Sequence, residues 1–176
     1  MSAFLGFSIC AVSLCAAVSP EIPDFQKRVG DYLKVRKTAD SSVGTLKTTD
    51  SAEKIEQHQL DLAQAIRTAR PHAAHGEIFT HAIAARFRHA IRHALSVPGA
   101  YRVKKGVTDT HLAPLPLVAV DAAYPKESPV QSMPPSLLAA LPELPHGLEY
   151  RFVGRTLILL DKDANLIVDY VNEALP

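Results

Sequence analysis

Histidine is the residue type with the most chemistry to offer in this chain, because five of its eight histidines lie in one stretch. Neutral imidazole nitrogens are good ligands for Ni, Co, Cu and Zn, so this stretch is a candidate metal site. The five residues are His72, His75, His81, His89 and His93. His89 and His93 are four residues apart, which makes them neighbours on one face of a helix.

Two features of the same stretch weigh against a specific metal site. No glutamate stands between His89 and His93 in the pattern that a metalloprotease needs. Arg86 and Arg92 flank the two histidines, and their positive charge disfavours a metal cation. His72 and His75 add ligands only if their loop folds back onto this helix. The sequence therefore favours a solvated face of His and Arg side chains, with metal binding as the alternative and no other cofactor predicted.

A calcium loop is the second candidate. Asp161, Asp163 and Asn165 match the first three ligand positions of an EF-hand loop. Leu166 then replaces the required glycine, and Asn172 replaces the final bidentate glutamate. Asp and Asn are also typical of tight turns, where they hydrogen-bond to the local backbone. We interpret this motif as a structural turn.

The third candidate is a basic cluster that could meet an anionic lipid surface. It consists of Lys27, Arg28, Lys34, Arg36 and Lys37, with only Asp31 opposing them. A charge-rich solvated face is the simpler interpretation. The sequence contains no nucleophile elbow, phosphate-binding glycine loop or paired-cysteine metal site, so no catalytic residue is predicted.

The N-terminus predicts that these residues work outside the cytoplasm. Ala3 to Val18 carry no charge and are mostly apolar, and the small residues before Val18 predict cleavage after Ala17. Residues 1–17 are therefore predicted to be a signal peptide, with a retained anchor or a buried helix as alternatives. Residues 18–176 then form one domain without cysteine, because Cys10 and Cys15 lie in the leader. The formal net charge of +1 gives no reason to expect nucleic acid as a partner.

Residues 23–96 have helical spacing of apolar residues. Asp24 is predicted to cap a first helix, which ends at a Ser, Thr and Gly-rich loop from Thr38 to Thr48. Asp50 and Glu53 form a capping box that opens a second helix, which stops before Pro71. A third helix begins near Thr80 and buries Ile83, Phe87, Ile91, Ala94 and Leu95.

Residues 97–147 form a Pro-rich connector, and residues 148–171 have the two-residue period of a three-stranded antiparallel meander. Within the connector, Leu117 to Val120 is predicted to be a short strand, and Pro135 to start a short helix that reaches Leu141. Leu157 to Leu160 is apolar on both faces, so both faces of that strand are predicted to be covered. The predicted fold class is α+β, with a helical layer packed on the meander.

Part of this second half resembles a known kind of protein. The pattern consists of Pro-Pro-x-Leu at 134–137, a Leu-Pro step, Tyr-Arg-x-Val-Gly at 150–154, and Leu-Ile-Val-Asp at 166–169. It is similar to the C-terminal module of small exported bacterial proteins, some of which are grouped with periplasmic nickel/cobalt homeostasis proteins. The resemblance covers under a quarter of the chain and implies export and a β-meander. It transfers no catalytic or ligand residue.

Together these features predict a non-enzymatic exported protein of the periplasm or the extracellular space. It would act as a small binding or accessory module for an unknown protein or small ligand, and it would meet a membrane only during export. One alternative is a metal-homeostasis accessory protein that uses the His72–His93 region. The other alternative is a hydrolase with a site in the Pro-rich segment.

Overall fold

The computed structural model of the chain describes residues 19–44, 46, 48–96, 117–124 and 133–176. These residues form three long helices, one short helix and a three-stranded antiparallel sheet, which confirms the predicted α+β class. The elements are α1 (Glu21–Val43), α2 (Ala52–Ala69), α3 (His81–Ser96), α5 (Pro135–Leu138), β1 (Leu148–Val153), β2 (Thr156–Asp161) and β3 (Leu166–Val171). The predicted signal peptide, residues 1–17, and much of the predicted Pro-rich connector lie outside the described residues.

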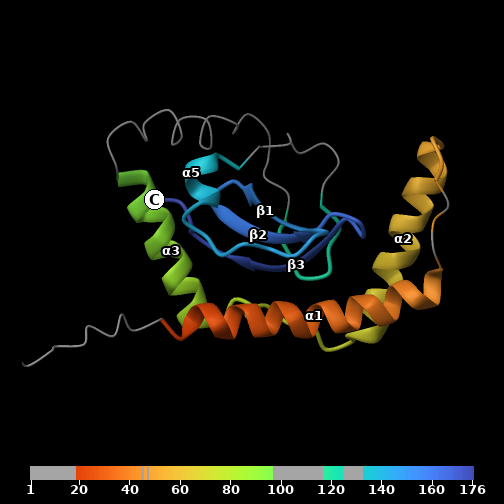
Figure 1. Cartoon of the computed structure of the whole chain (residues 1–176), viewed down its shortest axis with the longest axis horizontal. Coiled ribbons are helices and arrows are strands. Elements are labelled where there is room, and N and C mark those ends of the chain that lie inside the picture. Colours follow the sequence, from red (N-terminus) through yellow and green to blue (C-terminus); the bar gives the residue numbers. More distant parts are fainter. Residues whose placement is uncertain (1–18, 45, 47, 97–116, 125–132) are drawn as a thin grey trace, which may run out of the picture.

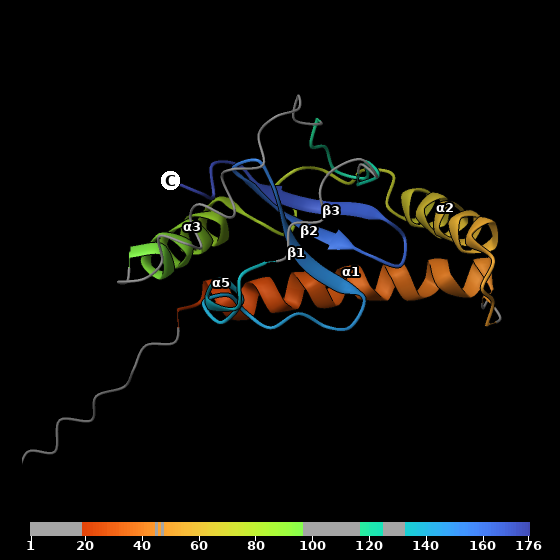
Figure 2. The ribbon, with the colours of Figure 1, turned by 90° about the horizontal axis from the view of Figure 1, so that it is seen from above.

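The helices surround the sheet on one face and at both ends. α1 runs along one face of the sheet, while α3 and α2 flank opposite ends of it (Figures 1 and 2). The short α5 lies near β1 and contacts α3. Each long helix therefore has one side that faces the sheet and another that faces away from it.

α1 is longer than predicted at both ends. It starts at Glu21, so Asp24 is not its cap but lies in the first turn, where its carboxylate pairs with Arg28 at 3.0 Å. Thr38, Ser41 and Ser42 continue the helix, and the hydroxyls of Thr38 and Ser41 donate to carbonyls one turn earlier. The helix stops at Gly44, whose φ of 84° is in the left-handed region that favours glycine.

The predicted start of α2 is wrong by one residue, and the predicted start of α3 is confirmed. Ser51, not Asp50, is the N-cap of α2, and its Oγ accepts a hydrogen bond from the Lys54 N–H. The Ser51 hydroxyl donates to the Glu53 carboxylate, and the Ser51 N–H donates to Thr49 Oγ1, so the predicted capping box does not form. α3 begins directly after Thr80, as predicted.

The meander is confirmed, with strand order β1-β2-β3 and antiparallel pairing throughout. A two-residue turn joins β1 to β2, and its Gly154 has a φ of 60° that suits glycine. The predicted strand from Leu117 to Val120 is wrong. Asp121 has a φ of 61° and bends the chain, so only an isolated bridge from Ala123 to Leu166 adds to the sheet there. α5 starts at Pro135 as predicted but ends at Leu138, before a looser turn.

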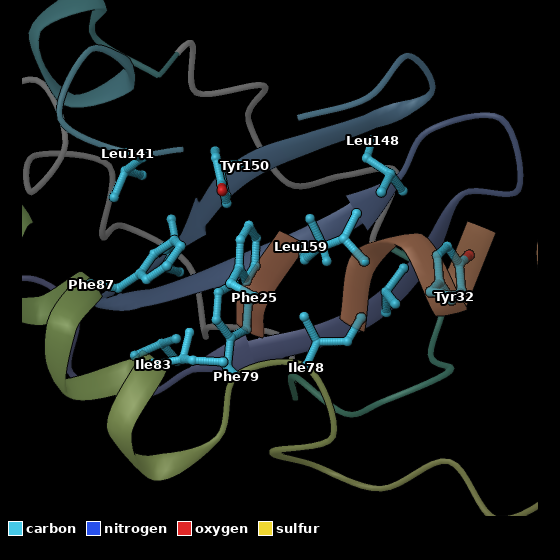
Figure 3. Packing of buried hydrophobic residues seen from close by; sticks show 14 of the residues in the cluster. Phe25, Tyr32, Ile78, Phe79, Ile83, Phe87, Leu141, Leu148, Tyr150 and Leu159 are labelled. Carbon is cyan, nitrogen blue, oxygen red and sulfur yellow. The ribbon is translucent and has the colours of Figure 1, made fainter. Parts of the chain in front are cut away.

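The main core lies between the sheet and the helices (Figure 3). Phe87 is its centre, with ring centroids 5.0 Å from Phe25 and 5.1 Å from Phe79. A smaller apolar cluster covers the opposite face of the sheet and contains Ile158 and Ile167. Both faces of β2 are therefore covered, as its apolar sequence predicted.

Candidate functional site

A groove with a volume of about 610 Å³ lies beside β1, which is an edge strand of the sheet. α5 and the loop after it form one wall, and β1 forms the other. The larger apolar side chains that line it are Met133, Leu138, Leu141, Leu144, Leu148 and Tyr150. Glu143, Glu149 and Arg151 supply the polar groups. A mostly apolar cavity of this size with a few polar groups is typical of a ligand-binding site.

Prolines set the wall of the groove in place. Pro135 opens α5, and the single turn that follows buries Leu137 while Leu138 is 46% exposed toward the groove. On the facing wall, the Tyr150 hydroxyl donates to the carbonyl of Pro142 at 3.1 Å. Burial raises the pKa of Tyr150, so this hydroxyl stays protonated and ties the loop to β1. The sequence placed a possible site in the Pro-rich segment but could not show that it faces β1.

The backbone of β1 also borders the groove. Val153 pairs with Thr156 across the two-residue turn, and every second residue of β1 from there bonds to β2. By this alternation, the N–H and C=O groups of Tyr150 and Phe152 point away from β2. Within the described ranges no other strand pairs with this edge. An extended chain in the groove would meet apolar surface and the outward backbone groups of Tyr150, which pair with no described strand.

A buried charged cluster joins α1 to the turn between β2 and β3. The Asp161 carboxylate is fully buried, accepts a hydrogen bond from the Tyr32 hydroxyl at 2.8 Å, and lies 2.9 Å from the Arg36 Nε. Arg36 also pairs with Asp163. Burial raises the pKa of Asp161, and the positive charge of Arg36 opposes that rise. The Asp-x-Asp-x-Asn motif therefore forms a structural turn whose carboxylates bind a guanidinium.

Gly147, which precedes β1, shows how closely this cluster is packed. Its φ is 91°, and a Cβ atom there would lie 2.5 Å from Arg36 Nη1. The same Cβ atom would lie 2.8 Å from a carboxylate oxygen of Asp163. Glycine is needed at this position for both the backbone angle and the close approach.

Asp169 on β3 organises the loop between α2 and α3. Its buried carboxylate accepts hydrogen bonds at 2.8 Å from the backbone N–H groups of Ile78 and Phe79, and at 3.0 Å from that of Gly76. These bonds hold the chain just before α3 and so help to fix which face that helix turns outward. The only signal in the sequence was a lone carboxylate in an otherwise apolar strand, which must find donors if it is buried.

The predicted histidine site is spread over two elements. His81, His89 and His93 are exposed on α3, and His72 and His75 are exposed in the loop before it. The ring of His75 stacks on Tyr170 of β3, with centroids 4.1 Å apart. Among the described residues, no three His, Cys, Asp or Glu side chains lie close enough to hold a metal ion. Metal binding by these histidines stays a hypothesis that depends on His89 and His93.

Four of the five cations in the basic cluster of α1 are paired within the protein. Lys27 and Lys34 bond to Asp31, Arg28 bonds to Asp24, and Arg36 bonds to the buried cluster. Hydrogen bonds from Lys34 and Lys27 lower the pKa of Asp31 from 3.8 to about 2. The interpretation as a solvated face is wrong for Arg36, whose side chain is only 18% exposed.

No family model, no curated protein and no solved structure matches this chain. Among the described helices, none combines the length and apolar character needed to cross a bilayer. The geometry of the site therefore carries the functional interpretation.

Proposed function

We propose that the protein is an exported, non-enzymatic binding or accessory protein. Its ligand is an extended apolar segment of another polypeptide, held in the groove beside β1. The observation that carries this proposal is the coincidence of an apolar groove with the outward backbone groups of Tyr150, which lines it. The apolar leader and the resemblance of residues 133–170 to exported proteins support export.

Such a ligand would bind by adding a strand to the sheet. Main-chain hydrogen bonds to a sheet edge give affinity, and side-chain pockets give specificity. Leu138 and Leu144 would contact alternate side chains of the ligand. The exposed carboxylate of Glu143 has no ion pair within the described residues, so a basic residue next to the apolar stretch fits the rim.

The test uses fluorescein-labelled peptides in which Val and Thr alternate, with one terminal Lys, and measures binding by anisotropy. Leu138→Glu should weaken binding at least about tenfold, because it places a charge in the apolar groove without disturbing the core. Leu60→Glu on α2 is the matched control, since Leu60 is 54% exposed and lies outside the groove. The same peptide with N-methyl groups at alternate residues should bind poorly, because it cannot bond to the strand edge.

Three results would overturn the proposal. The first is the absence of peptide binding to the wild-type chain. The second is equal binding by the Leu138→Glu variant. The third is undiminished binding of the N-methylated peptide, which would leave an apolar pocket without strand addition.

A further inference from the structure

The outward face of α3 carries two arginines, Arg86 and Arg92, whose positive charge no described residue neutralises, together with three histidines. The helix contains three arginines and three histidines and no acidic residue. Its exposed or half-exposed members on this face are His81, Arg86, His89, Arg92 and His93. Within the described part of the chain, none of these five side chains makes an ion pair or a hydrogen bond. This face is thus unlike that of α1, where four of the five clustered cations are paired.

The remaining residues of this face are small. Ala82, Ala85 and Ser96 lie between the Arg and His side chains by helical spacing, and all three are exposed. Nothing bulky therefore stands between the guanidinium groups and an approaching surface. The helix has 16 residues, so the face extends over about 24 Å.

The position of α3 gives a flat partner access to this face. The helix lies at one end of the sheet, and its apolar side, with Ile83, Phe87 and Ile91, packs into the core (Figures 1 and 3). The cationic side is consequently turned away from the sheet. Only a partner that offers many negative charges on its surface would complement it.

We propose that this face of α3 binds an anionic lipid surface through phosphate headgroups. A protein partner would be expected to meet aromatic or large apolar anchors, and the face has none. A nucleic acid would be expected to meet a strongly basic protein, whereas this chain has a formal net charge of only +1. Basic residues near an anionic membrane are attracted to it individually, so Arg86 and Arg92 together are sufficient for weak binding.

Binding of this kind is weak and depends on salt. The apolar side of α3 is buried in the protein, so the helix contributes electrostatic attraction and no insertion into the acyl chains. Exposed charges are screened over short distances when salt is added. This membrane contact lies on α3 and is independent of the peptide groove beside β1.

The experiment is co-sedimentation of the full chain with phosphatidylcholine vesicles, with and without about 30 mol% phosphatidylglycerol, at about 0.05 M and 0.5 M NaCl. The readout is the difference in binding between the two vesicle compositions, because an apolar leader would bind both compositions. Wild type should prefer the anionic vesicles at low salt and lose this preference at high salt. Arg86→Gln with Arg92→Gln should lower the preference about tenfold or more, as expected for two basic residues.

The matched control is Lys27→Gln with Lys37→Gln, which removes the same charge from α1. The control should keep most of the preference, and circular dichroism should show that both double variants are folded. Equal binding to both vesicle compositions would overturn the proposal. So would equal losses in the two double variants, which would show a response to net charge alone. Displacement from the vesicles by polyglutamate, but not by equally charged soluble phosphate esters, would assign the face to an acidic protein instead.

Discussion

α1 and α3 are both amphipathic helices with many basic side chains, but the protein uses these charges differently. In α1, each of four cations meets a carboxylate of the same chain, and the Arg36 side chain reaches the buried Asp161. In α3, no acidic residue is present, and the cations of the outward face have no partner within the described residues. Basic residues in a sequence therefore do not by themselves define a binding surface. Charge that the fold has already neutralised is not available to a ligand, and only the remainder is.

The largest expected effect comes from Arg36. Arg36→Ala removes the cation beside Asp161 and leaves a buried carboxylate without its ion-pair partner, which costs about 3–5 kcal/mol of unfolding free energy. Arg92→Ala on α3 should change stability by less than about 0.5 kcal/mol, as exposed substitutions usually do. Urea denaturation midpoints of the two variants measure the contrast. Equal midpoints would mean that Arg36 contributes no more to stability than the exposed Arg92. The contrast between the two helices would then be wrong.

The pH dependence of the Arg36→Ala variant separates charge from packing. Without Arg36, the burial that raises the pKa of Asp161 is opposed less. As the pH falls toward the ordinary value of 3.8, the folded variant takes up a proton on Asp161 before the unfolded chain does, which stabilises the folded state. The deficit of the variant relative to wild type should therefore shrink between pH 7 and pH 4. A constant deficit would assign the effect to lost packing.

The sequence predicted elements whose pattern is local and missed contacts that are distant. The meander and α3 follow from two-residue and helical periods, which depend only on neighbouring residues. The end of α1 was placed too early because Ser and Thr can satisfy their hydroxyls either within a helix or in a loop. Arg36 could not be distinguished from its solvated neighbours, because its partners Asp161 and Asp163 are far along the chain. The groove required knowledge of how the Pro-rich segment returns to β1.

The next prediction compares the middle of the sheet with the outer face of α3. Ile158→Ala should destabilise the protein by about 2–5 kcal/mol, because Ile158 is fully buried in the smaller apolar cluster. His89→Ala should cost less than about 0.5 kcal/mol, because His89 is exposed and has no partner within the described residues. Guanidinium denaturation of both variants gives the two values. An early transition for the His89→Ala variant would show that the outward face of α3 is covered, and the lipid proposal would lose its basis.

The smallest expected effect concerns metal ions on the same face. His89 and His93 offer two imidazoles, Arg86 and Arg92 stand beside them, and no third ligand joins them among the described residues. A divalent metal held by two ligands in a cationic surrounding has neither full coordination nor charge compensation. Calorimetry of tag-free protein with Ni²⁺, Co²⁺, Cu²⁺ and Zn²⁺ should therefore show only weak, unselective binding that His89→Ala with His93→Ala leaves unchanged. Saturable micromolar binding that the double substitution abolishes would instead support the metal-homeostasis alternative and would place a cation, not a lipid headgroup, on the outward face of α3.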